Sequence, residues 1–170
     1  MLEFRHTKLE DIERIMEIIT QAQRYFKENG IDQGHNGYPN ARVIENDIKN
    51  NHSYVLLKND EIVATVAISF DGEATYNEIF NGSWKSHSDY VVIHRVAVDN
   101  HVKGIGLSSE IIAHTASLAM KKGVHSIKVD THEDNLAMQR SLTKNGFDYR
   151  GVIYLADGSK RVAFEKVLAY

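Results

Sequence analysis

One run of β-branched residues constrains the fold more than any other part of the chain. The segment Tyr90–Val98 is apolar on both faces of the strand that it predicts, so this strand is expected inside a sheet and not at its surface. It continues through residues 99–103 into Gly104-Ile105-Gly106, and a helix is predicted over Leu107–Lys121. This order of strand, glycine turn and helix favours a fold that mixes helices with a sheet.

Periodic apolar residues and turn residues predict the other elements. Thr7 and Glu10 predict a capping box at the start of a helix that ends near Gly30. Residues 71–89 are polar and poorly periodic, so irregular structure is expected there. Further helices are predicted after Pro39 and over Asn135–Lys144, and further strands over Ser53–Lys58, Glu61–Phe70, Val124–Asp130, Phe147–Leu155 and Lys160–Leu168. The expected class is α/β in the broad sense (α+β), as one domain over residues 1–170.

Composition excludes several classes of function. A formal charge of −3 gives no electrostatic basis for nucleic-acid binding and favours cationic small molecules. No run of 18 apolar residues predicts a membrane helix, and the first residues lack the basic and apolar segments of a signal peptide, so a cytoplasmic location is expected. Cysteine is absent, which excludes thiolate catalysis and cysteine-ligated metals.

The glycine turn is a candidate phosphate site. Two glycines before a helix let backbone N–H groups approach a phosphate, and the helix dipole and Lys103 add positive charge. A simple tight turn is the structural alternative. The Gly-Lys-Ser/Thr ending of a P-loop and the third glycine of a dinucleotide fingerprint are both missing.

A second pattern runs from Asn135 through a short helix to Gly146-Phe147. The structural alternative is that Asn135 simply caps this helix. Together, in this order and separation, the two patterns resemble the GNAT superfamily of acetyltransferases, which transfer an acetyl group from acetyl-CoA to an amine. The likeness covers about residues 91–147. It departs at His101, where the family usually has glutamine or arginine.

The resemblance implies a mostly antiparallel mixed sheet with a splayed strand pair that binds the cofactor. The backbone of Val96–Val98 would pair with the pantetheine arm, and the N–H of Val98 would polarise the thioester carbonyl. Asn135 would hydrogen-bond the arm or the phosphates. The implied cofactor-binding residues are Val96, Ala97, Val98, Val102, Lys103, Gly104, Ile105, Gly106, Leu107, Ser108 and Asn135, with no metal.

Catalysis of this kind needs a neutral amine, so a base is expected. The resemblance implies an acidic base five positions before Asn135, at Asp130, and His132 is the alternative. His94 is expected to be a core histidine. Where many members have a proton-donating tyrosine, this chain has Leu142. Water, Ser141 or Tyr149 could donate the proton instead.

The acceptor residues are expected between the two N-terminal helices and in the irregular segment. Gln33, Tyr38 and Trp84 are the candidates, with core packing as the alternative for each aromatic residue. The expected acceptor is a small-molecule amine, and many family members are dimers, so a homodimer is compatible with the resemblance.

Three alternatives remain open. The chain could be a catalytically idle acyl-CoA sensor, which Leu142 favours, or an acetyltransferase of protein N-termini. A metal site at His125, Asp130, His132 and Glu133 is the third, and its spacing matches no known ligand pattern.

Overall fold

The structure is a computed structural model that describes residues 1–32, 37–102 and 106–169. Its sheet has seven strands in the hydrogen-bonded order β1-β2-β3-β4-β5-β7-β6 among these residues. The strands are β1 (Leu2–His6), β2 (Ser53–Lys58), β3 (Glu61–Ser69), β4 (Val91–Val98), β5 (Ser126–Thr131), β6 (Asp148–Tyr154) and β7 (Lys160–Val167). The α-helices of the described residues are α1 (Ile12–Glu28), α2 (Ala41–Lys49), α3 (Leu107–Lys121) and α4 (Leu136–Lys144).

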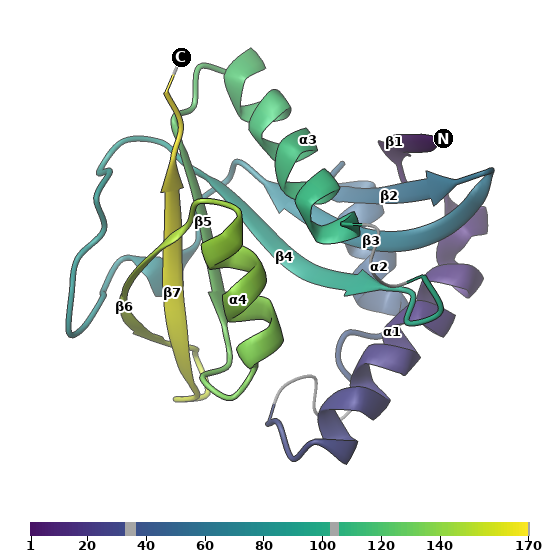
Figure 1. Ribbon diagram of the computed structural model, residues 1–170, viewed down its shortest axis with the longest axis horizontal. Coiled ribbons are helices and arrows are strands. Elements are labelled where there is room, and N and C mark those ends of the chain that lie inside the picture. Colours follow the sequence, from purple (N-terminus) through teal and green to yellow (C-terminus); the bar gives the residue numbers. More distant parts are fainter. Residues whose placement is uncertain (33–36, 103–105, 170) are drawn as a thin grey trace. The chain divides into compact units, whose positions relative to one another are not determined.

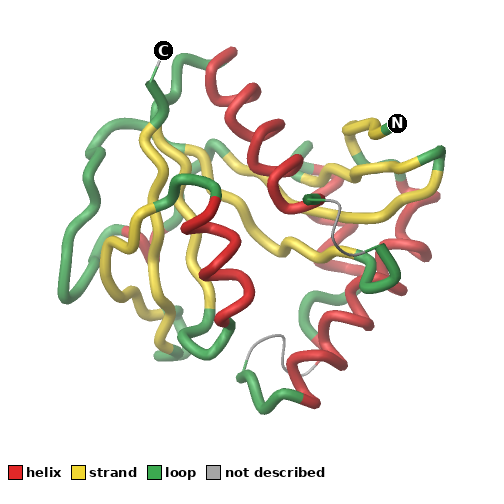
Figure 2. The backbone as a smooth tube through the Cα atoms, in the orientation of Figure 1, coloured by secondary structure: helices red, strands yellow, loops and turns green. Residues whose placement is uncertain are grey.

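The pairing of the strands confirms the predicted mixed, mostly antiparallel sheet. β1–β2, β2–β3, β5–β7 and β6–β7 are antiparallel pairs, whereas β4 and β5 are parallel. The parallel ladder joins Val91 to Ile127 and Val92 to Lys128, which are the first two residues of β4 and their partners. Figure 2 shows the strands with the helices and loops that connect them.

The chain divides into two compact units. Unit 1 comprises Met1–Ile68 and His94–Ile111, and unit 2 comprises Ser69–Ile93 and Ile112–Tyr170.

Unit 1 contains α1 and α2 packed on strands of the sheet (Figure 1). Ile15, Ile18 and Ile19 recur at helical spacing and are buried with Ile44 of α2 and Val55 of β2. The apolar periodicity that predicted these helices thus arises because each helix buries one face in the core. Between β2 and β3, Asn59 and Asp60 both have positive φ, as in a type I′ hairpin turn.

The predicted capping box at Thr7 and Glu10 is wrong. The buried Thr7 hydroxyl lies 2.7 Å from the hydroxyl of Ser53, so it forms a hydrogen bond to another segment of the chain. Asp11 takes the capping role, because its carboxylate accepts the Lys8 N–H at 2.7 Å. A short 3-10 helix, Leu9–Asp11, then leads into α1.

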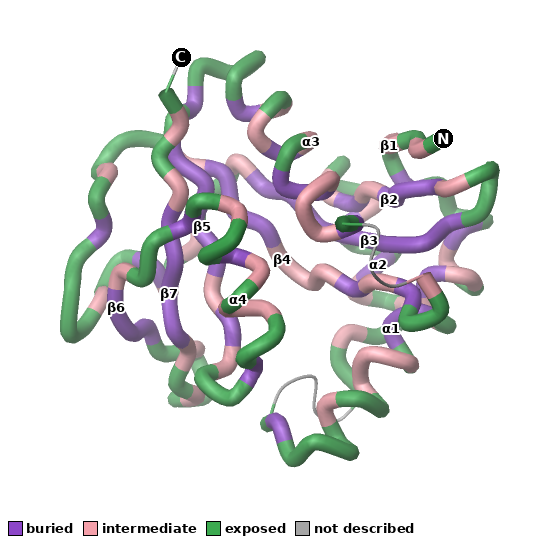
Figure 3. Tube along the Cα trace, in the orientation of Figure 1, coloured by how far each residue is buried: buried purple, intermediate pink, exposed green. Residues whose placement is uncertain are grey.

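Unit 2 contains β5, β6, β7, the beginning of β4, and α4, which runs beside β5 and β7 in Figure 1. The segment between β3 and β4 carries the 3-10 helix η3 (Ala74–Tyr76) and is otherwise without regular structure, as predicted. It is nevertheless part of the core, since Tyr76 and Trp84 are buried with Ile153 and Ala163 (Figure 3 shows the buried parts of each strand).

A buried acidic residue fixes this irregular segment. The carboxylate of Glu165 on β7 accepts the N–H groups of Lys85 and Ser86 at 2.6 and 3.1 Å, and the Ser126 hydroxyl at 2.7 Å. Lys128 donates from its ammonium to the Ser86 carbonyl at 3.1 Å. The backbone at Lys85 and Ser86 is therefore held by one anion and one cation.

Two glycines allow the same segment to approach β6 closely. A Cβ at Gly82 would lie 1.9 Å from the Arg150 carbonyl oxygen, and one at Gly151 would lie 2.6 Å from that of Phe80. The contact includes an isolated antiparallel bridge between Phe80 and Val152. Glycine is thus required at both positions by the backbone-to-backbone distance.

Candidate active site

Arg95 interrupts β4 just before the predicted cofactor-binding residues. Its φ of 52° lies in the left-handed region, which non-glycine residues seldom adopt inside a strand. The guanidinium donates two hydrogen bonds to Asp47 of α2, at 2.8 and 2.6 Å, and a longer one to the Tyr38 hydroxyl at 3.3 Å. Asp47 is buried, so a bidentate ion pair anchors the residue from which Val96–Val98 extend.

Asp99 organises the turn that follows β4. Its carboxylate accepts hydrogen bonds from the His101 N–H at 3.0 Å and from Arg14 of α1, and its own N–H donates to the Val63 carbonyl at 2.8 Å. Burial alone would raise the pKa of Asp99, but the His101 N–H and the Arg14 guanidinium outweigh it and lower that pKa to about 2. The turn is therefore held by an ionised carboxylate at neutral pH.

The start of α3 keeps the features of a candidate anion site. Gly106 has a φ of 72°, nothing lies within 4 Å of the position its Cβ would take, and its carbonyl accepts the Glu110 N–H. The N–H groups in the first turn of a helix have no partner within that helix, so those at Leu107 and Ser108 are suited to an anion. The Val102 N–H is used within the turn, to the Asp99 carbonyl at 3.1 Å. Lys103, Gly104 and Ile105 lie outside the described residues.

In unit 2, Asp130 at the end of β5 lies between a phenol and a guanidinium. The Tyr76 hydroxyl donates to Asp130 Oδ2 at 2.7 Å, and Arg161 Nη1 lies 3.8 Å from Oδ1, which is longer than a hydrogen bond. The side chains of Asp130 and Arg161 are each 15% exposed. Burial, reinforced by the charge of Asp130, raises the pKa of the Tyr76 hydroxyl well above its usual value, so the phenol remains a donor.

His132 and Asn135 are engaged with the backbone around α4. The Asp134 N–H donates to His132 Nδ1 at 3.0 Å, which places the proton of the neutral imidazole on Nε2. Asn135 is buried, and its side-chain oxygen accepts the Met138 N–H at 3.2 Å. Asn135 therefore caps α4, as the structural alternative predicted.

The acceptor candidates lie in different environments. Tyr38 is 48% exposed and bonded to Arg95, whereas Trp84 is 7% exposed and donates its indole N–H to the Tyr76 carbonyl at 2.9 Å. Trp84 thus contributes to the core of unit 2. Gln33 lies outside the described residues.

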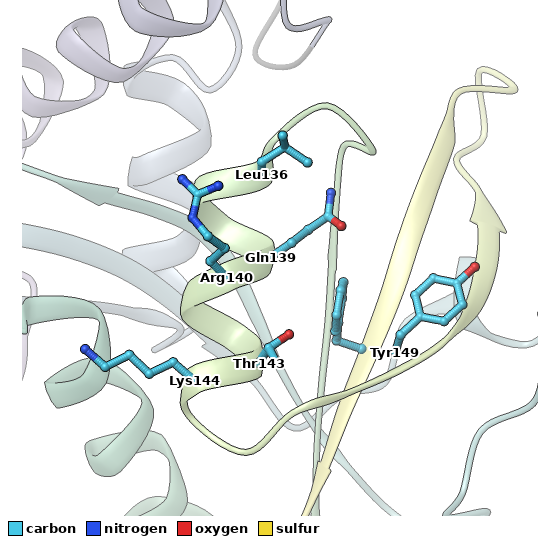
Figure 4. A pocket seen from close by; sticks show the side chains of 7 residues that line it. Leu136, Gln139, Arg140, Thr143, Lys144 and Tyr149 are labelled. Atoms are coloured by element: carbon cyan, nitrogen blue, oxygen red, sulfur yellow. The ribbon is translucent and has the colours of Figure 1, made fainter.

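Leu142, at the position where a tyrosine was expected from the resemblance, is buried. Tyr149 is 51% exposed and packs edge-on against Phe164. It borders a shallow depression of about 700 Å³ between α4 and the neighbouring strands (Figure 4). The other residues that line this depression are Leu136, Gln139, Arg140, Thr143, Lys144 and Phe164.

Sequence reasoning missed Tyr76, Arg161, Arg95 and Asp47. Tyr76 lies in the segment without periodicity, and its partner is 54 residues further along the chain. Arg95 was visible only as a charged residue that follows His94 inside a run of apolar residues. That break in the β-branched run was the one signal that could have singled it out.

No three His, Asp or Glu side chains in residues 1–32, 37–102 and 106–169 are grouped so that they could hold a metal ion. The metal alternative at His125, Asp130, His132 and Glu133 therefore gains no support. Over the same residues, no helix has the length and apolar character needed to cross a membrane.

The mixed, mostly antiparallel sheet flanked by helices is the fold of the GNAT acetyltransferases. The family model described as the Acetyltransferase (GNAT) family matches residues 12–147, and the chain belongs to this family. No curated protein matched the chain in a sequence search.

Solved structures agree with this assignment. A GNAT-family acetyltransferase from Streptococcus agalactiae superimposes with a TM-score of 0.90 at 30% identity, covering 99% of this chain and 96% of that one. An N-acetyltransferase from Staphylococcus aureus shares the fold at 17% identity (TM-score 0.69, 99% of both chains). The ribosomal-protein-S18-alanine N-acetyltransferase of Escherichia coli shares it at 13% identity (TM-score 0.66, 100% of this chain and 96% of that one).

Proposed function

We propose that this protein transfers the acetyl group of acetyl-CoA to the primary amine of a small molecule by direct attack. The observation that carries the proposal is the succession, in unit 1, of an anchored strand end at residues 96–98 and a helix start at residues 106–108. On one side, Val96–Val98 follow an anchored Arg95 and lead into the Asp99 turn. On the other side, a left-handed glycine opens a helix whose first N–H groups suit an anion.

The residues present fit the cofactor. The N–H groups at the start of α3, with Gly106, Leu107 and Ser108, would hold its phosphates, together with Val102 and residues 103–105. The backbone of Val96–Val98 would bind its extended arm, and the Val98 N–H would donate to the thioester oxygen. Bound acetyl-CoA supplies an acetyl group on a thioester.

The transfer releases a proton that the protein must accept. An amine with a pKa near 10 is mostly protonated at pH 7, so the nucleophile forms by proton loss before or during attack. In the transfer the amine nitrogen would form the new C–N bond as the C–S bond breaks, the electron pair of the C–S bond would leave with the CoA thiolate, and the proton of the amine would pass to a nearby acceptor of the protein. We assign this role to Asp130, because Nδ1 of His132 already accepts a backbone N–H.

A small cationic acceptor is supported by charge and by the exposed Tyr38. The formal charge of −3 favours approach of cations, and the Tyr38 hydroxyl is held by Arg95. The Escherichia coli relative is named for a protein acceptor, so peptides belong in the test beside small amines.

The test is acetyl-CoA binding by calorimetry, followed by CoA release with polyamines, amino sugars, amino acids and N-terminal peptides. Binding with turnover of a small amine supports the proposal. Turnover of peptides alone moves the acceptor class to protein N-termini. Binding without any turnover favours the acyl-CoA sensor, and absence of binding overturns the proposal.

Replacement of the assigned proton acceptor is the second test. Asp130→Asn is expected to lower kcat about a hundredfold or more, because the amide cannot take up the proton, with acetyl-CoA affinity nearly unchanged. Asp148→Asn is the control, since Asp148 is exposed at the start of β6. Equal kcat in the two variants over the whole pH range would remove Asp130 as the base.

A further inference from the structure

The hydrogen bond between Tyr76 and Asp130 links the irregular segment to the end of β5. At 2.7 Å it is a short bond from a phenol to a carboxylate, and the two residues are 54 positions apart in the sequence. Tyr76 is 3% exposed, so its hydroxyl does not face solvent. A contact of this kind gives Asp130 a partner that water does not replace.

The ring of Tyr76 is fixed from several directions. Its centroid lies 5.1 Å from that of Trp84 and 6.2 Å from that of Tyr90. The Trp84 indole donates to the Tyr76 carbonyl, so backbone and ring of Tyr76 are both held. Next to Trp84, Glu165 and Lys128 bind the backbone of Lys85 and Ser86.

The cation of Lys128 completes this support. Its Nζ lies 4.4 Å from the centroid of the Trp84 ring and 4.1 Å from that of Tyr90. Lys128 and Asp130 are two residues apart on β5, so their side chains project on the same face of the strand. Lys128 therefore fixes the aromatic cluster on the face from which Asp130 meets Tyr76.

The charges around Asp130 favour one orientation of its carboxylate. Tyr76 donates to Oδ2 from η3, and Arg161 of β7 lies near Oδ1. Lys128 on β5 is a further cation, and Glu73 and Tyr90 are the other groups whose charge acts on Tyr76. Burial raises the pKa of the Tyr76 hydroxyl well above its usual value, so the hydroxyl is a hydrogen-bond donor at neutral pH.

We propose that Tyr76 is a positioning residue that orients the Asp130 carboxylate for proton transfer from the acceptor amine. This inference rests on the proposed function, in which Asp130 receives that proton. Tyr76 acts through Asp130, and its hydroxyl is buried in the aromatic cluster with Trp84 and Tyr90.

The test is Tyr76→Phe, which removes one oxygen and retains the ring. We expect kcat to fall about ten- to a hundredfold, as for loss of a hydrogen bond to a charged group, with the Kd for acetyl-CoA unchanged. The acid limb of the kcat profile should move to higher pH, because a hydrogen bond donated to a carboxylate favours its ionised form. Circular dichroism and Tm check that the variant is folded.

Tyr90→Phe is the matched control. It removes a hydroxyl from the same cluster, and that hydroxyl accepts the Glu73 N–H at 3.0 Å. We expect the control to keep the wild-type pH profile. A Tyr76→Phe variant that matches Tyr90→Phe in kcat and in its pH profile would overturn the positioning role.

Failure of the positioning role and failure of the proposed function are distinguishable. If Asp130→Asn loses activity while Tyr76→Phe does not, the proposed function stands and the positioning role is wrong. In the double variant, Tyr76→Phe should add almost nothing to Asp130→Asn, whereas additive losses would show that Tyr76 acts independently. If no amine is turned over, carbon-13 NMR decides: the titration midpoint of Asp130 must rise in Tyr76→Phe relative to Tyr90→Phe.

Discussion

At the scale of single residues, the ion pair between Asp47 and Arg95 affects both the stability of the fold and the proposed cofactor site. Arg95 adopts a left-handed backbone conformation that costs an arginine roughly 1–2 kcal/mol. Two hydrogen bonds to a buried carboxylate hold it there. Removing the carboxylate would leave both the strained backbone and a half-buried guanidinium without this support.

Asp47→Asn is therefore expected to lower the free energy of unfolding by about 2–3 kcal/mol. The affinity for acetyl-CoA should also fall, since Val96–Val98 directly follow Arg95. Urea unfolding and calorimetry measure the two effects. Glu45→Gln on the exposed face of α2 serves as the control and should change neither quantity.

A second single-residue effect concerns Asp99 and pH. Its folded-state pKa of about 2 lies below the ordinary value of 3.8, so the folded state is stabilised above about pH 4. This stabilisation is lost as the pH falls from about 4 to about 2. Arg14→Gln removes one of the groups that keep Asp99 ionised, and the pKa of Asp99 should rise toward 3.8.

NMR titration of the Asp99 carboxyl measures this shift, and acid unfolding should then begin at higher pH in Arg14→Gln. Arg24→Gln, an exposed position on the same helix, is the control. An unchanged titration of Asp99 in Arg14→Gln would show that His101, through its N–H and its imidazole, keeps Asp99 ionised without Arg14.

At the scale of elements, the segment between β3 and β4 is ordered without being regular. Two of its backbone N–H groups, those of Lys85 and Ser86, donate to Glu165 of β7, and the Ser86 carbonyl accepts from Lys128 of β5. An unmet buried N–H costs about 1–3 kcal/mol, so one carboxylate can determine the conformation of several residues.

Glu165→Gln should lower the free energy of unfolding by about 2–4 kcal/mol, because the amide presents only one acceptor oxygen to three donors. Hydrogen exchange at Lys85 and Ser86 should quicken in the same variant. The comparison variant is Glu133→Gln, whose exposed pair with Lys160 contributes little. Similar stabilities of the two variants would contradict the role of Glu165.

At the scale of the whole molecule, most elements could be predicted from the sequence because each is periodic within its own length. The helix over Leu107–Lys121 and the strand over Ser53–Lys58 have the predicted bounds. The strand β1 was not predicted, since five residues with partly exposed side chains give too short a pattern.

Parts of the candidate site could likewise be predicted from neighbouring residues in the sequence, and other parts could not. The resemblance to the family implied Val96–Val98, and the glycine turn between a strand and a helix singled out Gly106. The contact of Tyr76 with Asp130 depends on side chains from distant segments, and no local pattern encodes it. Thr7 shows the same limit, because its partner Ser53 is 46 residues away.

The bridge between Phe80 and Val152 also affects how the molecule behaves among its copies. β6 ends the sheet, and a terminal strand with unused backbone groups is a template on which chains from other molecules can assemble. Here the N–H and the carbonyl of Val152 are both bonded to Phe80, each at 2.8 Å. The glycines at 82 and 151 that permit this contact therefore help to protect the protein from aggregation through that strand.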